Sequence, residues 1–140
     1  MNRPKILFVW PPKIEDITST FRHIVCFGET AGYFSEKPEY EVKIMDGGVL
    51  LYHLKDFALE FTKDYDAIAM HIEPNNIEAG INTVSLAKDI SPRTKVIAFG
   101  TAPCLNSEFL MREGKFEILK RDNRHRKIKS VIYGVSSTRP

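Results

Sequence analysis

The sequence predicts an α/β protein, with a flavodoxin-like, doubly wound parallel sheet of five strands in the order 2-1-3-4-5. Short apolar runs alternate with helical patterns along the chain, which is typical of β-α-β units joined by right-handed crossovers. The first run, residues 5–10, reads K-I-L-F-V-W and is stopped by Pro11 and Pro12. A continuous apolar run of this kind indicates a central strand that is buried on both faces.

The remaining elements follow from periodicity and from turn residues. The second strand is predicted at an edge of the sheet, because one of its faces carries Glu41 and Lys43. Strands are predicted over residues 5–10, 40–45, 66–72, 95–99 and 116–119, and residues 129–135 form a further strand or a hairpin with the fifth. Helices are predicted over residues 21–34, 50–62, 77–89 and 106–112, with Asn75 or Asn76 capping the third.

Composition and charge favour one domain in residues 1–118, followed by a basic C-terminal segment in residues 119–140. The chain has 140 residues, of which 43% are hydrophobic and 27% charged, as in an ordinary globular domain. Residues 1–111 carry 11 Lys/Arg and 15 Asp/Glu, whereas residues 112–140 carry 9 and 3. The basic end could contact an acidic partner, a phosphate-bearing ligand or nucleic acid, but a solvated end is the simpler interpretation.

The compartment predicted from the sequence is the cytoplasm. No apolar stretch approaches the ~20 residues of a membrane helix, and the N-terminus lacks the features of a signal peptide. The two cysteines are too few for a disulfide framework and are expected to be reduced. We therefore predict no membrane partner, and because a solvated basic end is the simpler interpretation of the charge, a nucleic-acid partner is not expected.

The loops at the carboxyl ends of the strands are where an open α/β sheet binds its ligand. They lack the glycine motifs of dinucleotide and P-loop sites, and the chain has no C-x-x-C pair. A phosphorelay receiver would need acidic residues after the first strand and an Asp closing the third. This chain has Pro11-Pro12 and His71-Ile72-Glu73 there, so we predict no metal site and no catalytic residues.

Two reactive groups near this edge have simpler structural explanations. His71 and Glu73 are two residues apart at the end of a strand, so they share a face and could pair. Cys104 follows the fourth strand, but the sequence ties no His or acid to it. Gly100 lies where the buried fourth strand leaves the sheet, which favours either close approach of a ligand or backbone, or an ordinary turn.

A series of motifs occurs in a recognisable order over residues 4–117. The first strand ends in P-P, residues 28–34 read G-x-x-A-G-Y-F, and the second strand ends in Asp46. The helix E-A-G-I-N-T-V-S-L-A-K-D-I-S-P follows the third strand, and K-V-I-A-F-G-T-A-P precedes S-E-F-L. This arrangement resembles the N-terminal cobalamin-binding domain of B12-dependent radical SAM enzymes.

The resemblance implies that cobalamin binds at the carboxyl ends of the strands, with the corrin over the first loop. Its nucleotide tail would lie between the loops after the third and fourth strands. The implied cofactor-binding residues are Pro11, Pro12, Lys13, Ile14, Glu73, Pro74, Asn75, Gly100, Thr101 and Ala102. Thr101 replaces the family's second glycine, and the D-x-H-x-x-G signature is missing, which implies that no protein His ligates the cobalt.

The family's catalytic domain does not follow in this sequence, which leaves three hypotheses. The chain would be a cobalamin-binding module, serving a partner radical SAM methyltransferase or related enzyme as a separate subunit or a truncated piece. Alternatively, it would be a degenerate domain that has lost the cofactor and acts as a protein-interaction module through its basic segment. The third hypothesis is a small enzyme using His71, Glu73 and Cys104.

Overall fold

The computed structural model of this chain describes residues 3–11, 21–47, 53–73, 76–100, 107–114, 116 and 118–119. Four strands form a parallel sheet in the order β2-β1-β3-β4. They are β1 (Lys5–Trp10), β2 (Glu41–Asp46), β3 (Ala67–His71) and β4 (Lys95–Phe99). This order confirms the flavodoxin-like arrangement predicted for the first four strands.

The outer side of β4 is paired much less extensively than the sequence predicts. The strand β5 (Ile118–Leu119) contributes two residues, which pair in parallel with Ile97 and Ala98. At this edge of the sheet, the predicted fifth strand is therefore represented only by a two-residue ladder. The strand or hairpin predicted over residues 129–135 lies outside the described residues.

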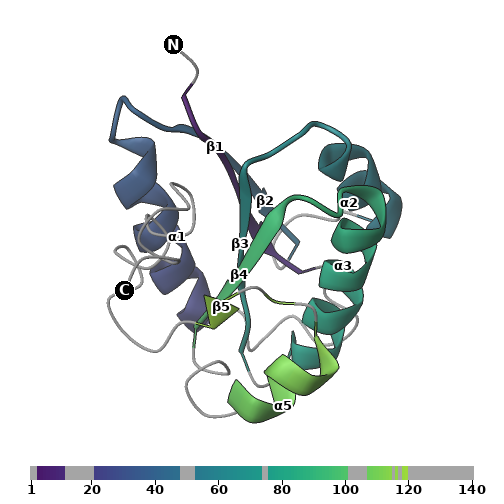
Figure 1. Ribbon diagram of the computed structural model, residues 1–140. Coiled ribbons are helices and arrows are strands. Elements are labelled where there is room, and N and C mark those ends of the chain that lie inside the picture. The colour runs from purple at the N-terminus through teal and green to yellow at the C-terminus, as the bar shows by residue number, and fades with distance from the viewer. Residues whose placement is uncertain are drawn as a thin grey trace, which may run out of the picture.

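Helices cover both faces of the sheet, as Figure 1 shows. The helix α1 (Phe21–Ser35) lies on one face, and α2 (Leu54–Phe61) and α3 (Ile77–Ile90) lie on the other. The short helix α5 (Ser107–Glu113) follows β4. None of the helices in the described ranges has the length and apolar character that crossing a membrane requires.

The apolar run of β1 supplies both halves of the core. Ile6, Phe8 and Trp10 pack with α1, whereas Leu7 and Val9 pack with the helices of the opposite face. These five side chains are at most 2% exposed. Alternating side chains of a strand point to opposite faces, so only an uninterrupted apolar run can fill both layers.

The predicted start of the second helix is wrong. The sequence pattern begins at residue 50, but His53 has an extended backbone and α2 begins at Leu54. The His53 N–H donates to Oδ2 of Asp56 at 2.7 Å, so this carboxylate satisfies a backbone donor at the helix start. Apolar spacing therefore extended the prediction past the capping residue that sets the boundary.

Candidate functional site at the carboxyl ends of the strands

The carboxyl ends of β1, β3 and β4 meet at one edge of the sheet. Trp10 closes β1, and His71 and Phe99 lie side by side at the ends of β3 and β4. Phe27 of α1 packs over them, and Glu73 follows β3. We call Trp10, Phe27, His71, Glu73 and Phe99 the strand-end cluster.

Aromatic rings surround the imidazole of His71 on several sides. The indole of Trp10 stacks on it, with ring centroids 4.5 Å apart and an interplanar angle of 29°. The ring of Phe99 lies 4.9 Å away and that of Phe27 6.0 Å away, both edge-on. His71 itself has no exposed surface, so the imidazole forms part of the aromatic core below the edge.

The predicted pairing of His71 with Glu73 is confirmed. Nε2 of His71 lies 2.5 Å from Oε2 of Glu73, and the Glu73 residue is 3% exposed. A carboxylate can only accept, so a hydrogen bond to the ionised form requires the Nε2–H tautomer or the imidazolium. Removing either group from this apolar surrounding would cost its partner a buried hydrogen bond.

Gly100 directly follows β4, and its backbone packs closely against the His71–Glu73 pair. Its φ is +114°, in a region that favours glycine. A Cβ there would lie 2.6 Å from the carbonyl oxygen of Ile72 and 3.0 Å from Oε2 of Glu73. Of the interpretations left open by the sequence, the structure therefore shows close approach of backbone.

Asn76 occupies the predicted capping position before α3, but its side chain does not cap the helix. Its Oδ1 instead accepts the Glu73 N–H at 2.6 Å, and its Nδ2 donates to the His71 carbonyl at 3.4 Å. The Asn76 N–H also donates to the Glu73 carbonyl at 3.0 Å. Asn76 therefore holds the turn that directs the Glu73 side chain back onto the sheet.

The predicted site residues are only partly within the described residues. Pro11 is buried next to Trp10, and Glu73 and Gly100 come together as above. The others, together with Cys104 of the enzyme hypothesis, lie outside: Pro12, Lys13, Ile14, Pro74, Asn75, Thr101 and Ala102. In the part of the chain that the structure describes, no group of three or more His, Cys, Asp or Glu could hold a metal ion.

Sequence reasoning did not identify the aromatic walls of the cluster or the role of Asn76. A usable signal was present for Trp10 and Phe99, because each is the last residue of a strand predicted to be buried. Phe27 carried no such signal, since its contact with Trp10 (5.8 Å between centroids) depends on how α1 crosses the sheet.

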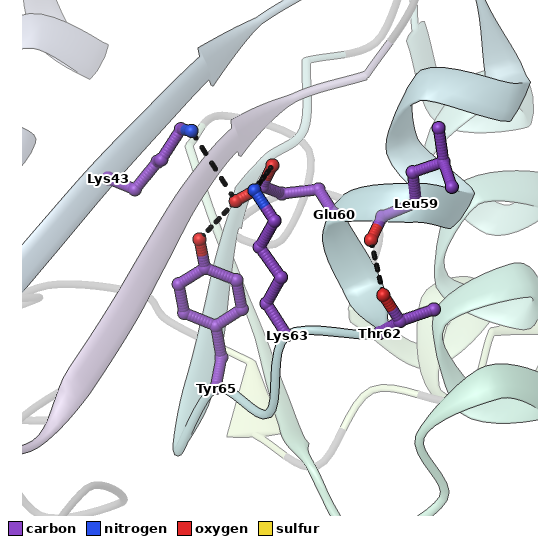
Figure 2. A network of polar contacts seen from close by, with 6 residues as sticks. All are labelled: Lys43, Leu59, Glu60, Thr62, Lys63 and Tyr65. Atoms are coloured by element: carbon purple, nitrogen blue, oxygen red, sulfur yellow. Dashed lines mark hydrogen bonds and ion pairs between the residues drawn. The ribbon is translucent and has the colours of Figure 1, made fainter.

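A second polar cluster lies near the amino end of β3, and we call Lys43, Glu60, Lys63 and Tyr65 the Glu60 cluster (Figure 2). The Tyr65 hydroxyl donates to Oε2 of Glu60. Nζ of Lys63 lies 3.2 Å from Oε1, and Nζ of Lys43 lies 3.7 Å from Oε2. The Glu60 side chain is 9% exposed, whereas those of Lys43 and Lys63 are 52% and 56% exposed.

Opposing effects set the protonation of this cluster. Burial raises the pKa of Glu60, but the hydrogen bonds from Tyr65 and Lys63 and the charges of Lys43 and Lys63 outweigh it. The net result is a pKa below its ordinary value of 4.5. Burial, together with the neighbouring Glu60, raises the pKa of Tyr65 well above its ordinary value of 10.0. Glu60 therefore stays ionised and Tyr65 stays protonated across the neutral range.

Comparison with known proteins places the fold. The response regulator domain of Thermotoga maritima CheB superposes with a TM-score of 0.60 at 15% identity, covering 99% of this chain and 100% of that one. The chain shares the flavodoxin-like fold of a response-regulator domain. The pilus assembly protein CpaE from Caulobacter crescentus CB15 aligns with a TM-score of 0.46 at 12% identity, over 91% of each chain. No family model matches the chain, and no curated protein matches its sequence.

Proposed function

We propose that this chain is a non-catalytic interaction module that binds a partner protein at the carboxyl edge of its sheet. The observation that carries the proposal is the burial of the strand-end cluster. The position where the fold presents reactive groups holds instead an imidazole packed between aromatic rings. Fold alone does not decide function, so the proposal depends on these side chains.

Phosphoryl transfer is poorly supported by this edge. A receiver needs carboxylates after β1 and an aspartate closing β3, whereas β1 ends in Trp10 followed by Pro11, and β3 ends in His71. A phosphoryl acceptor must be accessible to its donor, but His71 has no exposed surface. Binding without chemistry therefore accounts better for buried aromatic side chains at the carboxyl ends of these strands.

The charge of residues 112–140 indicates what kind of surface the partner protein presents. Residues 112–140 carry 9 Lys/Arg against 3 Asp/Glu, and they follow the strand β4 that contributes to the edge. A basic segment that follows this domain in the sequence favours a partner with an acidic surface, through attraction that weakens as salt screens it.

Two measurements test this proposal. Incubation with acetyl phosphate and Mg²⁺ should leave the intact mass of the protein unchanged. Affinity capture from the source organism should enrich a defined acidic protein. That protein should be lost when Lys120, Arg121, Arg124, Arg126, Lys127 and Lys129 are replaced by Gln. A stable phosphoryl adduct, or capture that survives the replacement, would count against it.

The cobalamin-binding module remains a second proposal. It would serve a partner radical SAM methyltransferase or related enzyme and hold cobalamin with no protein His ligand to cobalt. Its specific support is that Glu73 and Gly100, two of the residues implied by the resemblance, lie together at the carboxyl edge. Because the rings of Trp10, Phe27 and Phe99 fill the space below this edge, the cofactor would have to lie above them.

The cobalamin proposal has a direct test. The protein is mixed with hydroxocobalamin and desalted, and its visible spectrum is recorded. Retained corrin absorbance that decreases in Thr101→Arg, but not in Lys63→Met of the Glu60 cluster at the other end of β3, would support cobalamin. A colourless protein would remove this candidate and leave the interaction module.

A further inference from the structure

The outer side of β2 presents backbone groups that the described strands do not use. β2 ends the strand order of the sheet and pairs with β1 on its inner side. The Glu41 N–H donates to the Pro4 carbonyl at 2.9 Å, and the Gly47 N–H donates to the Trp10 carbonyl at 2.8 Å. Alternate residues of a parallel strand bond to the same neighbour, so the intervening residues Val42 and Ile44 direct their N–H and C=O groups outward.

The side chains of β2 divide into two faces with different chemistry. Val42 packs partly against the core beneath α1, and the next residue on that face, Ile44, is 44% exposed. On the other face, Lys43 reaches Glu60 of α2, and Glu41 is exposed. Opposite charges at alternate positions on one face are self-complementary when two such strands run antiparallel.

We propose that the outer edges of β2 from two copies of this chain pair antiparallel about a two-fold axis, with Val42 opposite Val42. Only outward-directed residues can form the hydrogen-bonded pairs of such a ladder, and Val42 is one of them. Glu41 of each copy then lies opposite Lys43 of the other, at the non-hydrogen-bonded positions where side chains are closest. The contact is isologous, as a closed dimer requires.

The charges of Glu41 and Lys43 favour the Val42-centred register over the two registers next to it. Moving the centre by one residue places Lys43 opposite Lys43 in one direction and Glu41 opposite Glu41 in the other. Like charges directly opposite one another are destabilising, whereas the Val42-centred register makes two opposite-charge pairs. It also places the exposed Ile44 over Tyr40 of the second copy, covering apolar surface that is otherwise in water.

The ladder is short, because one of its donors is already used. The Tyr40 N–H donates to the Lys37 carbonyl at 3.2 Å, and the Tyr40 carbonyl accepts from Nη1 of Arg3 at 3.5 Å. The ladder therefore consists of the two hydrogen bonds of the central Val42 pair, and on either side the Ile44 N–H of each copy would share the Tyr40 carbonyl oxygen with Arg3. A short ladder of this kind fits a reversible, concentration-dependent dimer.

Sedimentation equilibrium of the full chain over a wide concentration series, with two charge variants, tests the proposal. Wild type should show twice the monomer mass at high concentration. Glu41→Lys and Lys43→Glu should each weaken self-association by roughly tenfold or more, because each brings two like-charge pairs together. An equimolar mixture of the two variants should recover association, since every facing pair is then of opposite charge. A monomeric wild type, or single variants that remain dimeric, would overturn the proposal.

A backbone variant separates strand pairing from other contacts. Val42→Pro removes an outward N–H that β1 does not use, which edge strands tolerate, and should abolish the dimer. Val42→Thr keeps the N–H and the β-branched shape, so it should dimerise like wild type. Circular dichroism of both variants is the control for correct folding. If folded Val42→Pro still dimerises, the interface lies elsewhere on the molecule.

Discussion

The strand-end cluster and the Glu60 cluster lie at opposite ends of β3 and stabilise a carboxylate in different ways. Glu73 pairs with an imidazole that has no exposed surface and is enclosed by aromatic rings. Glu60 is also mostly buried, but it takes a hydrogen bond from Tyr65 and charge from two half-exposed lysines. The first carboxylate is therefore stabilised within tightly packed side chains. The second is stabilised by donors near solvent, whose protonation can change.

This difference predicts how each end responds to change. Removing one member of an enclosed pair costs the other a buried hydrogen bond, so substitutions there should be costly. A cluster with access to water and several donors can redistribute its contacts, so single losses should be smaller and sensitive to pH and salt. The chain has one tryptophan, Trp10, and it stacks on His71, so its fluorescence reports directly on the first region.

The largest effect is expected when the His71–Glu73 pair is broken. His71→Leu leaves the Glu73 carboxylate buried without the imidazole, and should lower the free energy of unfolding by about 3–5 kcal/mol. Urea unfolding followed by Trp10 fluorescence measures the loss. The double variant His71→Leu/Glu73→Leu should be less destabilised than the sum of the two single variants, because it removes both polar groups. Additive losses would show that the two side chains are not energetically coupled.

A smaller loss, of about 2–4 kcal/mol, is expected for Gly100→Ala. The new Cβ must occupy a positive-φ backbone and displace the Ile72 carbonyl, 2.6 Å away, or the Glu73 side chain. Gly28→Ala is the matched control, since nothing lies within 4 Å of its Cβ, and alanine in a helix should stabilise by about 0.5–1 kcal/mol. Thermal unfolding of both variants gives the comparison. Equal effects at the two glycines would contradict the close packing at the strand ends.

Removing the tyrosine hydroxyl tests the Glu60 cluster. Tyr65→Phe should cost about 1–2 kcal/mol near neutral pH, because Glu60 loses one donor but keeps Lys63 at 3.2 Å. Chemical denaturation at neutral pH measures this loss.

The same cluster should make stability depend on pH in both directions. A lowered pKa for Glu60 means that its contribution is complete above 4.5 and is lost as the pH falls below that value. A raised pKa for Tyr65 means that its contribution is complete below 10.0 and is lost as the pH rises above it. Tyr65→Phe should remove the alkaline loss and reduce the acid loss. An unchanged alkaline limb would assign that loss to another group.

The sequence was sufficient to predict the first four strands of the sheet and insufficient to predict the side chains at its carboxyl edge. The β1 run and the alternation of elements predicted the order of four strands, because burial on both faces leaves a clear apolar signature. The pairing of His71 with Glu73 was also predictable, since positions i and i+2 of a strand share a face. The stacking of Trp10 and Phe27 around His71 was not, because it depends on the position of α1 over the sheet.

Local hydrogen bonding explains the errors at the starts of two helices. Asn76 has the residue type and position of a helix cap, but its side chain is used by the Glu73 turn. The helix predicted from residue 50 begins at Leu54, because Asp56 caps the His53 N–H. In both cases propensity identified the correct region, and a contact three residues away decided the structure.

The smallest effect is expected at the exposed side of the Glu60 cluster. Lys43→Met removes an ammonium 3.7 Å from Oε2 of Glu60, and should change the free energy of unfolding by less than about 1 kcal/mol, because the lysine is half exposed. Lys63→Met is the matched control, with its nitrogen 3.2 Å from Oε1, and should have an equal or larger effect. Measurements at low protein concentration exclude any contribution from pairing of β2 edges.

The dependence of stability on salt tests whether these lysines act through their charge. At about 1 M salt the screening length falls to roughly 3 Å, so the difference between wild type and Lys43→Met should nearly vanish. The Gly100→Ala difference should persist under the same conditions, because it arises from backbone strain and steric overlap rather than from charge. If the Lys43 effect survives high salt, the lysine stabilises the fold by packing its methylene chain, and the two ends of β3 differ less than the geometry implies.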